Sequence, residues 1–106
     1  MTNAEKEILA KFKALLSKRV SIYKMILFGS RARGDADQSS DMDIAVILNE
    51  PVKERDVDYV SDCAWEAGFE YGIVVVPVVF TREQWENSPE RFSLLVQAAE
   101  MEGVAV

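Results

Sequence analysis

Apolar residues at helical spacing predict two long helices in this chain. Between residues 3 and 18, apolar side chains recur every three or four positions among lysines and a glutamate, and Thr2 or Asn3 is suited to cap the first turn. A second helix is predicted over residues 53–69, with Gly68 near its end. Its inward-facing residues are expected to be Val57, Val60, Ala64 and Ala67.

Three apolar runs rich in β-branched residues predict strands. The first covers residues 20–28 and ends at Gly29. The second covers residues 41–48, and after its two aspartates it is apolar on both faces, which is typical of a central strand. The third covers residues 72–80, where Pro77 indicates an edge position or a bulge.

Shorter elements complete the pattern. Residues 30–33 are expected to open a brief helix that Gly34 ends, and Thr81 is expected to cap a helical turn. A last helix is predicted over residues 88–101, followed by a short strand at residues 104–106. The order helix, strand, turn, strand, helix, strand, helix predicts an α/β (α+β) fold with a small mixed sheet flanked by helices.

Length and composition favour one small domain. The chain has 106 residues, of which 49% are apolar, so we expect a single domain over residues 1–106. Its longest apolar run is far shorter than the roughly 20 residues of a membrane span, and it begins with no basic and apolar leader. With Cys63 as its single cysteine, a reducing, cytoplasmic location is expected. The absence of histidine excludes catalysis by histidine and metal binding by histidine.

The acidic balance of the chain bears on its partners. The net charge is −6, which argues against nucleic-acid binding because such proteins normally carry a basic patch. A basic protein is the better match for an acidic chain of this size.

One pattern carries chemistry. Gly29 and Ser30 follow the first predicted strand, and ten residues later Asp41 and Asp43 begin the second. Alternate residues of a strand share a face, so both carboxylates point the same way, beside a turn whose first amides are unpaired. Carboxylates hold Mg²⁺ and such amides seat a phosphate. The pattern therefore indicates phosphoryl or nucleotidyl transfer from a nucleoside triphosphate.

Positive charge lies next to this pattern. Arg31 and Arg33 follow Ser30 within one helical turn, and Arg33 is the better candidate for an additional phosphate contact.

The strings Gly-Ser-Arg-Ala-Arg-Gly at 29–34 and Ser-Asp-Met-Asp-Ile at 40–44 resemble the signature of the DNA polymerase β-like nucleotidyltransferase superfamily, in particular its minimal nucleotidyltransferases. Many members of that branch are antitoxins paired with HEPN-family toxins, which are helical ribonucleases. The resemblance implies a palm-type fold and transfer of AMP from Mg-ATP to a tyrosine hydroxyl of such a toxin, as in type VII-like toxin–antitoxin pairs. It assigns Gly29 and Ser30 to the triphosphate and Asp41 and Asp43 to the metal.

The sequence departs from the superfamily at its third carboxylate. That group normally comes from the next core strand and takes the proton of the acceptor hydroxyl, yet residues 72–80 contain no acid. Three readings remain open: Glu70 substitutes, the partner activates its own hydroxyl or supplies a base, or the chain acts by contact alone. We prefer the second, and a solvated surface acid is the simplest interpretation of Glu70.

Two other functional classes follow from the same observations. A non-catalytic module would neutralise its partner by covering it, and a small-molecule nucleotidyltransferase would need a separate acceptor subunit. Among the aromatic residues we expect core packing, with a partner-facing patch as the alternative for Trp85 and Phe92. Core packing is also expected for Tyr59, Trp65 and Tyr71.

Overall fold

A computed structural model describes residues 1–34, 36–37, 39–87, 96–97 and 103–106. Its elements follow the predicted order. They are α1 (Asn3–Leu16), β1 (Ile22–Phe28), α2 (Ser30–Arg33), β2 (Met42–Leu48), α3 (Glu54–Phe69), β3 (Val75–Thr81), α4 (Arg82–Asn87) and β4 (Val104–Ala105). The helix predicted over residues 88–101 lies outside the described residues, apart from Val96 and Gln97, which are helical.

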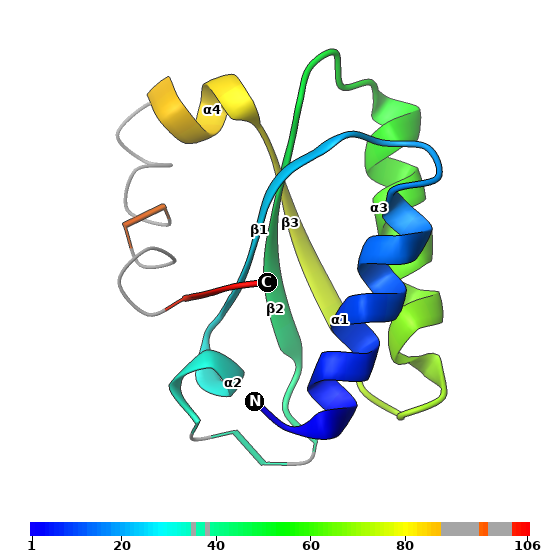
Figure 1. Cartoon of the computed structure of the whole chain (residues 1–106), viewed down its shortest axis with the longest axis vertical. Helices are drawn as coiled ribbons and strands as arrows, with labels where there is room; N and C mark the ends of the chain where they lie inside the picture. Colours follow the sequence, from blue (N-terminus) through cyan, green and yellow to red (C-terminus); the bar gives the residue numbers. More distant parts are fainter. Residues whose placement is uncertain (35, 38, 88–95, 98–102) are drawn as a thin grey trace.

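The strands form one mixed sheet in the order β3-β2-β1-β4. β2 is parallel to β3 and antiparallel to β1, so it is central, as its continuous apolar sequence predicted. Figure 1 shows α1 and α3 side by side on one side of the sheet and α4 on the other. The expected small mixed sheet flanked by helices is therefore confirmed, and Pro77 lies on an edge strand of the described sheet.

Each face of the sheet covers its own apolar core. Toward α1 and α3, the core includes Phe12, Leu27, Ile44 and Val60, all at most 1% exposed. Toward α4, a smaller cluster is formed by Ile26, Ala45, Ile47, Phe80, Trp85 and Val96. Alternate residues of β2 thus point into different cores, which fixes the direction of every side chain on that strand.

Element ends differ little from the predicted ones, with one exception. β3 begins at Val75, three residues later than predicted, because the chain first makes a turn at Gly72, whose φ is +64°. In this turn the Ile73 N–H donates a hydrogen bond to the Gly68 carbonyl (3.2 Å). A Cβ on Gly68 would lie 2.0 Å from the Ile73 carbonyl oxygen, so the close approach of α3 to this turn requires glycine.

Two predictions about α3 are wrong. Trp65, expected in the core, is 68% exposed, and Val57, expected to face inward, is 38% exposed. Small residues such as Ala64 and Ala67 bring the helix close to the sheet. Trp65 follows Ala64 in the sequence, and the helix rotates by about 100° per residue, so its side chain points away from that face. Trp85 does pack in a core: its ring meets Phe80 edge-on, with 5.4 Å between centroids. Phe92 lies outside the described residues.

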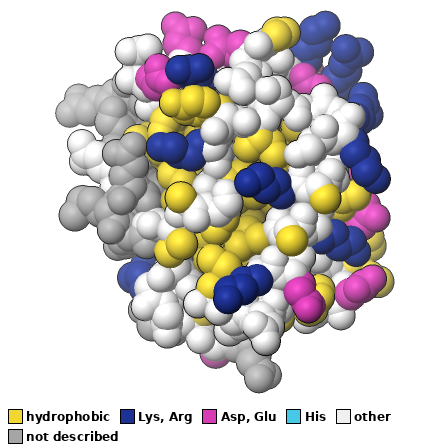
Figure 2. Space-filling view, viewed as in Figure 1, with side chains coloured by type: hydrophobic (Ala, Val, Ile, Leu, Met, Phe, Trp, Pro, Cys, Tyr) yellow, Lys and Arg dark blue, Asp and Glu magenta, His cyan; other side chains and the backbone are white. Residues whose placement is uncertain are grey.

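The acidic charge of the chain is unevenly distributed. Figure 2 shows hydrophobic side chains along the middle of one face, with Lys and Arg among and around them, while acidic side chains gather toward the edges of the view. Among the described residues, no helix has the length and apolar character needed to cross a membrane.

Candidate functional site

The Gly-Ser turn joins β1 to α2 through a backbone conformation that only glycine adopts readily. Gly29 has φ +75° and ψ −157°, and its carbonyl accepts hydrogen bonds from the N–H groups of Ala32 and Arg33, both at 3.1 Å. Gly34, in the left-handed conformation with φ +80°, ends the helix as predicted. Ser30 therefore lies at the first turn of α2, directly after β1.

The second half of the motif lies against this turn. In the sheet register, Asp43 pairs with Phe28 of β1, the residue before Gly29. A Cβ built on Gly29 would come within 2.6 Å of Asp43 Oδ2, so the backbone of the turn nearly touches this carboxylate. Asp43 shares a strand face with Ala45 and Ile47, and it therefore points to the side of the sheet that carries α4.

The two carboxylates influence each other. Asp41 is exposed and Asp43 is half-buried. Burial, with the negative charge of Asp41, raises the pKa of Asp43 above its ordinary value. Two neighbouring anions, one of them partly desolvated, are stabilised by a bound cation, and carboxylate oxygens are ligands that Mg²⁺ prefers. The residues present thus fit a divalent cation held by two protein carboxylates.

Among the described residues, no third carboxylate joins this pair. Val76 of β3 pairs with Asp43 and lies on the same sheet face, so it occupies the position from which a third acid would face the pair. Glu70 follows α3 and forms an ion pair with Lys11 of α1 (3.7 Å), on the opposite side of the sheet. Within the described residues no three potential metal ligands come together. In this arrangement Glu70 does not supply a third carboxylate to the pair.

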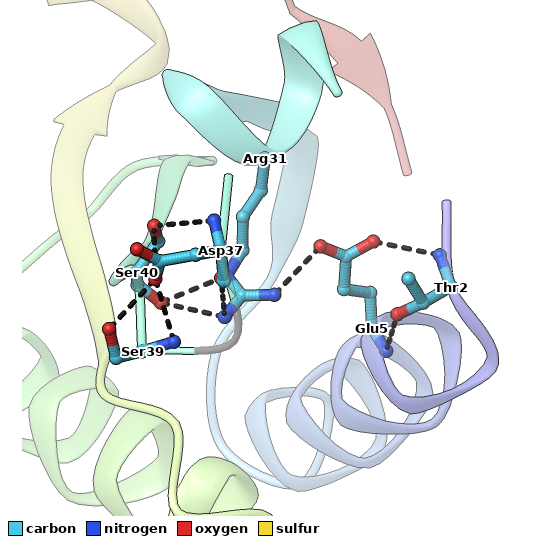
Figure 3. A network of polar contacts seen from close by, with 6 residues as sticks. All are labelled: Thr2, Glu5, Arg31, Asp37, Ser39 and Ser40. Carbon is cyan, nitrogen blue, oxygen red and sulfur yellow. Dashed lines mark hydrogen bonds and ion pairs between the residues drawn. The ribbon is translucent and has the colours of Figure 1, made fainter. Parts of the chain in front are cut away.

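Figure 3 shows a network of polar contacts centred on Arg31, in which Arg31 and Glu5 are buried. Arg31 is 9% exposed, and its Nη1 donates to Glu5 Oε2 of α1 at 2.9 Å. Its Nε and Nη2 donate to the Ser40 carbonyl at 3.0 and 2.7 Å, and Nη2 also reaches the Asp37 carbonyl at 3.5 Å. Ser40 directly precedes Asp41, so this one side chain ties α1 and α2 to the backbone that presents the carboxylates.

Glu5 completes the network from the other side. It forms a capping box with Thr2: the Glu5 N–H donates to Thr2 Oγ1 (3.1 Å), and the Thr2 N–H donates to Glu5 Oε1 (2.8 Å). Burial raises the pKa of Glu5, but the hydrogen bonds from Thr2 and Arg31 and the Arg31 charge outweigh it, so this pKa is lowered overall. Sequence reasoning missed Glu5 at the site. The Thr-x-x-Glu spacing signals the cap, but nothing local signals a partner 26 residues away.

Of the two arginines in the motif, Arg33 is the exposed one. It ends α2 three residues after Ser30. Arg31, in contrast, is buried against Glu5, and the additional phosphate contact by Arg33 stays a prediction.

We expect Gly29→Ala to destabilise the fold by about 2–4 kcal/mol, since its backbone angles strain any L-residue and its Cβ would collide with Asp43. Gly34→Ala is the matched control. It also has positive φ, but no atom lies within 4 Å of its Cβ, so the expected cost is about 1 kcal/mol. Urea unfolding of both variants measures the difference. Equal costs would show that the approach of Gly29 to Asp43 is unimportant.

Fold and motif together define a nucleotidyltransferase, and comparison with known proteins agrees. The model of the nucleotidyltransferase domain family matches residues 8–106, and the chain belongs to this family. Over 82 residues it is 43% identical to "Putative protein adenylyltransferase MJ0604" of Methanocaldococcus jannaschii, covering 76% of this chain and 77% of that protein.

Two further similarities span more of the chain. It is 28% identical over 94 residues to "Probable protein adenylyltransferase MntA" of Haemophilus influenzae, covering 89% of this chain and 82% of that protein. The crystal structure of "a putative nucleotidyltransferase from Sulfolobus solfataricus" matches with a TM-score of 0.46 and 18% identity, covering 99% of this chain and 86% of that one.

Proposed function

We propose that this nucleotidyltransferase transfers AMP from Mg-ATP to a tyrosine hydroxyl of a HEPN-family toxin, and that it is the antitoxin of a type VII-like toxin–antitoxin pair. The observation that carries the proposal is the close approach of Gly29, in the Gly-Ser turn, to the Asp43 carboxylate, two residues after Asp41. The names of the relatives support a protein as acceptor. The HEPN partner follows from the family resemblance of the motif.

Each motif residue has a role in this proposal. Gly29 lets the triphosphate approach the backbone, Ser30 contributes its N–H and hydroxyl, and Arg33 adds positive charge. Asp41 and Asp43 would hold Mg²⁺. Such an ion, when bound, would supply positive charge that stabilises the negative charge developing as the leaving group departs.

The proposed reaction is an in-line displacement. The acceptor oxygen forms a bond to the α-phosphorus of ATP, the bond from that phosphorus to the oxygen bridging the α- and β-phosphates breaks, and pyrophosphate leaves with the electron pair. The acceptor proton needs a base. Val76 lies where a third acid would face Asp43, and Glu70 pairs with Lys11. We therefore assign activation of the acceptor hydroxyl to the partner protein, one of whose groups takes the proton.

The test is transfer of label from ATP to a HEPN-family protein supplied as partner. We expect the partner to gain label from ATP labelled at the α-phosphate and none from ATP labelled at the γ-phosphate, because only AMP is transferred. Intact mass spectrometry should show the mass of whole AMP units. Labelling from γ-labelled ATP would instead indicate phosphoryl transfer and would contradict the proposal.

A second candidate function is neutralisation of the partner by contact alone. The position of Val76 opposite Asp43 favours it, because the described residues then lack an acid for acceptor activation. Its signature is a partner that is bound and inactive without ATP and keeps its unmodified mass.

A further inference from the structure

A second surface lies at the edge of the sheet, away from the Gly-Ser turn. Trp65 and Phe69 on the outer face of α3 are 68% and 65% exposed, and their ring centroids are 4.8 Å apart. Val74, 62% exposed, and Pro77 continue this surface onto β3, around a cavity of about 460 Å³. We call these four residues the aromatic edge. Large apolar side chains so exposed in one patch are typical of a protein-binding surface.

The backbone of β3 limits how a partner can bind here. β3 is an edge strand of the described sheet, and the Val74 carbonyl accepts a hydrogen bond from the Met42 N–H (2.9 Å), so the backbone groups of Val74 face β2. These groups alternate in direction along a strand, so those of position 77 face outward, where proline has no N–H to donate. An added strand would lose a hydrogen bond at this position. The aromatic edge is therefore better suited to the side chains of a helix.

Charge identifies the kind of helix. α3 contains five acidic residues and a single basic one, Arg55. Asp58 and Asp62 are exposed and precede Trp65 by seven and three residues, so they lie on its helical face. A second copy of the chain docked through the same surface would bring these carboxylates close to the same carboxylates of the other copy, and the like charges would repel. A partner with basic residues beside its apolar side chains gains attraction instead.

We propose that the aromatic edge, with Asp58 and Asp62, binds a basic amphipathic helix of a partner protein. The Val74 carbonyl accepts the hydrogen bond of the Met42 N–H, so this surface borders the start of β2, while Asp43 points to the other face of the sheet. The inference goes beyond nucleotidyl transfer, because binding at this surface requires neither ATP nor the motif.

The probe is a fluorescein-labelled peptide of about 18 residues, long enough to form a helix, with leucine on one face and lysine on the other. We expect it to bind the full chain, as measured by anisotropy. Trp65→Ser with Phe69→Ser should raise its Kd by about tenfold or more, and Asp58→Asn with Asp62→Asn by about threefold or more. Circular dichroism checks folding, and Trp65→Gln alone serves as a milder variant.

The matched control is Glu50→Gln with Glu83→Gln. It removes two exposed carboxylates near the other end of β2, where the Glu83 N–H donates to Glu50 Oε1 (3.0 Å), and should change the Kd by less than about twofold. Three results would overturn the proposal: no binding of the peptide, equal binding of a leucine–glutamate peptide, or an unchanged Kd in the Trp65/Phe69 variant. A dimer in sedimentation that this variant dissociates would assign the surface to a second copy and also overturn it.

Discussion

Replacing Asp41 and Asp43 together by asparagine is expected to lower nucleotidyl transfer by about a thousandfold or more and to leave the fold intact. Asparagine keeps the size of each side chain but removes the negative charge that would hold the cation against the triphosphate. The readout is label from α-labelled ATP on the partner protein. Glu50→Gln with Glu83→Gln, which removes two charges away from the motif, should transfer at the normal rate.

The same variant is expected to be as stable as the unmutated chain or slightly more so. Burial and the charge of Asp41 raise the pKa of Asp43. A carboxyl with a raised folded-state pKa binds its proton more tightly in the folded than in the unfolded chain, so stability rises as pH falls toward that pKa, and the ionised pair costs stability at neutral pH. Asparagine removes this cost.

Thermal unfolding at neutral pH separates the two ways in which activity can be lost. Loss of transfer with an equal or higher Tm supports the assignment of the carboxylates to the site. A clear fall in Tm would mean that the aspartates hold the fold, and continued transfer would mean that the reaction takes place elsewhere.

The second large effect is expected at the buried ion pair. Arg31→Met should destabilise the fold by about 3–5 kcal/mol, because it leaves the Glu5 carboxylate buried without its partner, and it also strips the Ser40 carbonyl of two hydrogen bonds. This is a large part of the roughly 5–15 kcal/mol that holds a small domain together. Urea unfolding measures the loss. Glu5→Gln should cost less, since its single amide oxygen can still accept from either the Thr2 N–H or Arg31. Arg31 also keeps its hydrogen bonds to the Ser40 carbonyl in this variant.

Two controls isolate the burial of the pair. Glu86→Gln breaks the Arg82–Glu86 pair, which has good geometry (2.8 Å) but side chains 51% and 43% exposed, so only a small change is expected. Glu5→Leu with Arg31→Met removes both buried charges and should cost less than the two single changes added together. If Arg31→Met proved as harmless as Glu86→Gln, the network would not support the motif.

The Glu5–Arg31 pair also predicts a pH dependence. The pKa of Glu5 is lowered in the folded chain from an ordinary value of 4.5. Its stabilisation is therefore fully present above 4.5 and is lost as the pH falls through the lowered value. In the Glu5→Gln variant this part of the acid destabilisation should disappear.

Local sequence determined most of the site. Gly29 and Gly34 lie at the two ends of a helix of one turn. Both positions have positive φ, which favours glycine, and both boundaries were predicted from residue type alone. The i, i+2 spacing of Asp41 and Asp43 predicted both on one face of a strand; Asp43 lies on β2, and Asp41 directly precedes that strand. The unbroken apolar run after them predicted a central strand, since only such a strand is covered on both faces.

Long-range packing decided the rest, because it depends on contacts between residues far apart in the chain. Glu5 meets Arg31 across 26 residues, and the register of β2 with β3 places Val76 opposite Asp43. Trp65 and Trp85 are equally apolar, yet one lies on the surface and the other in a core. The sequence by itself determined the order of elements and the motif. Only the tertiary structure decided what supports the motif and which aromatic side chains remain for a partner.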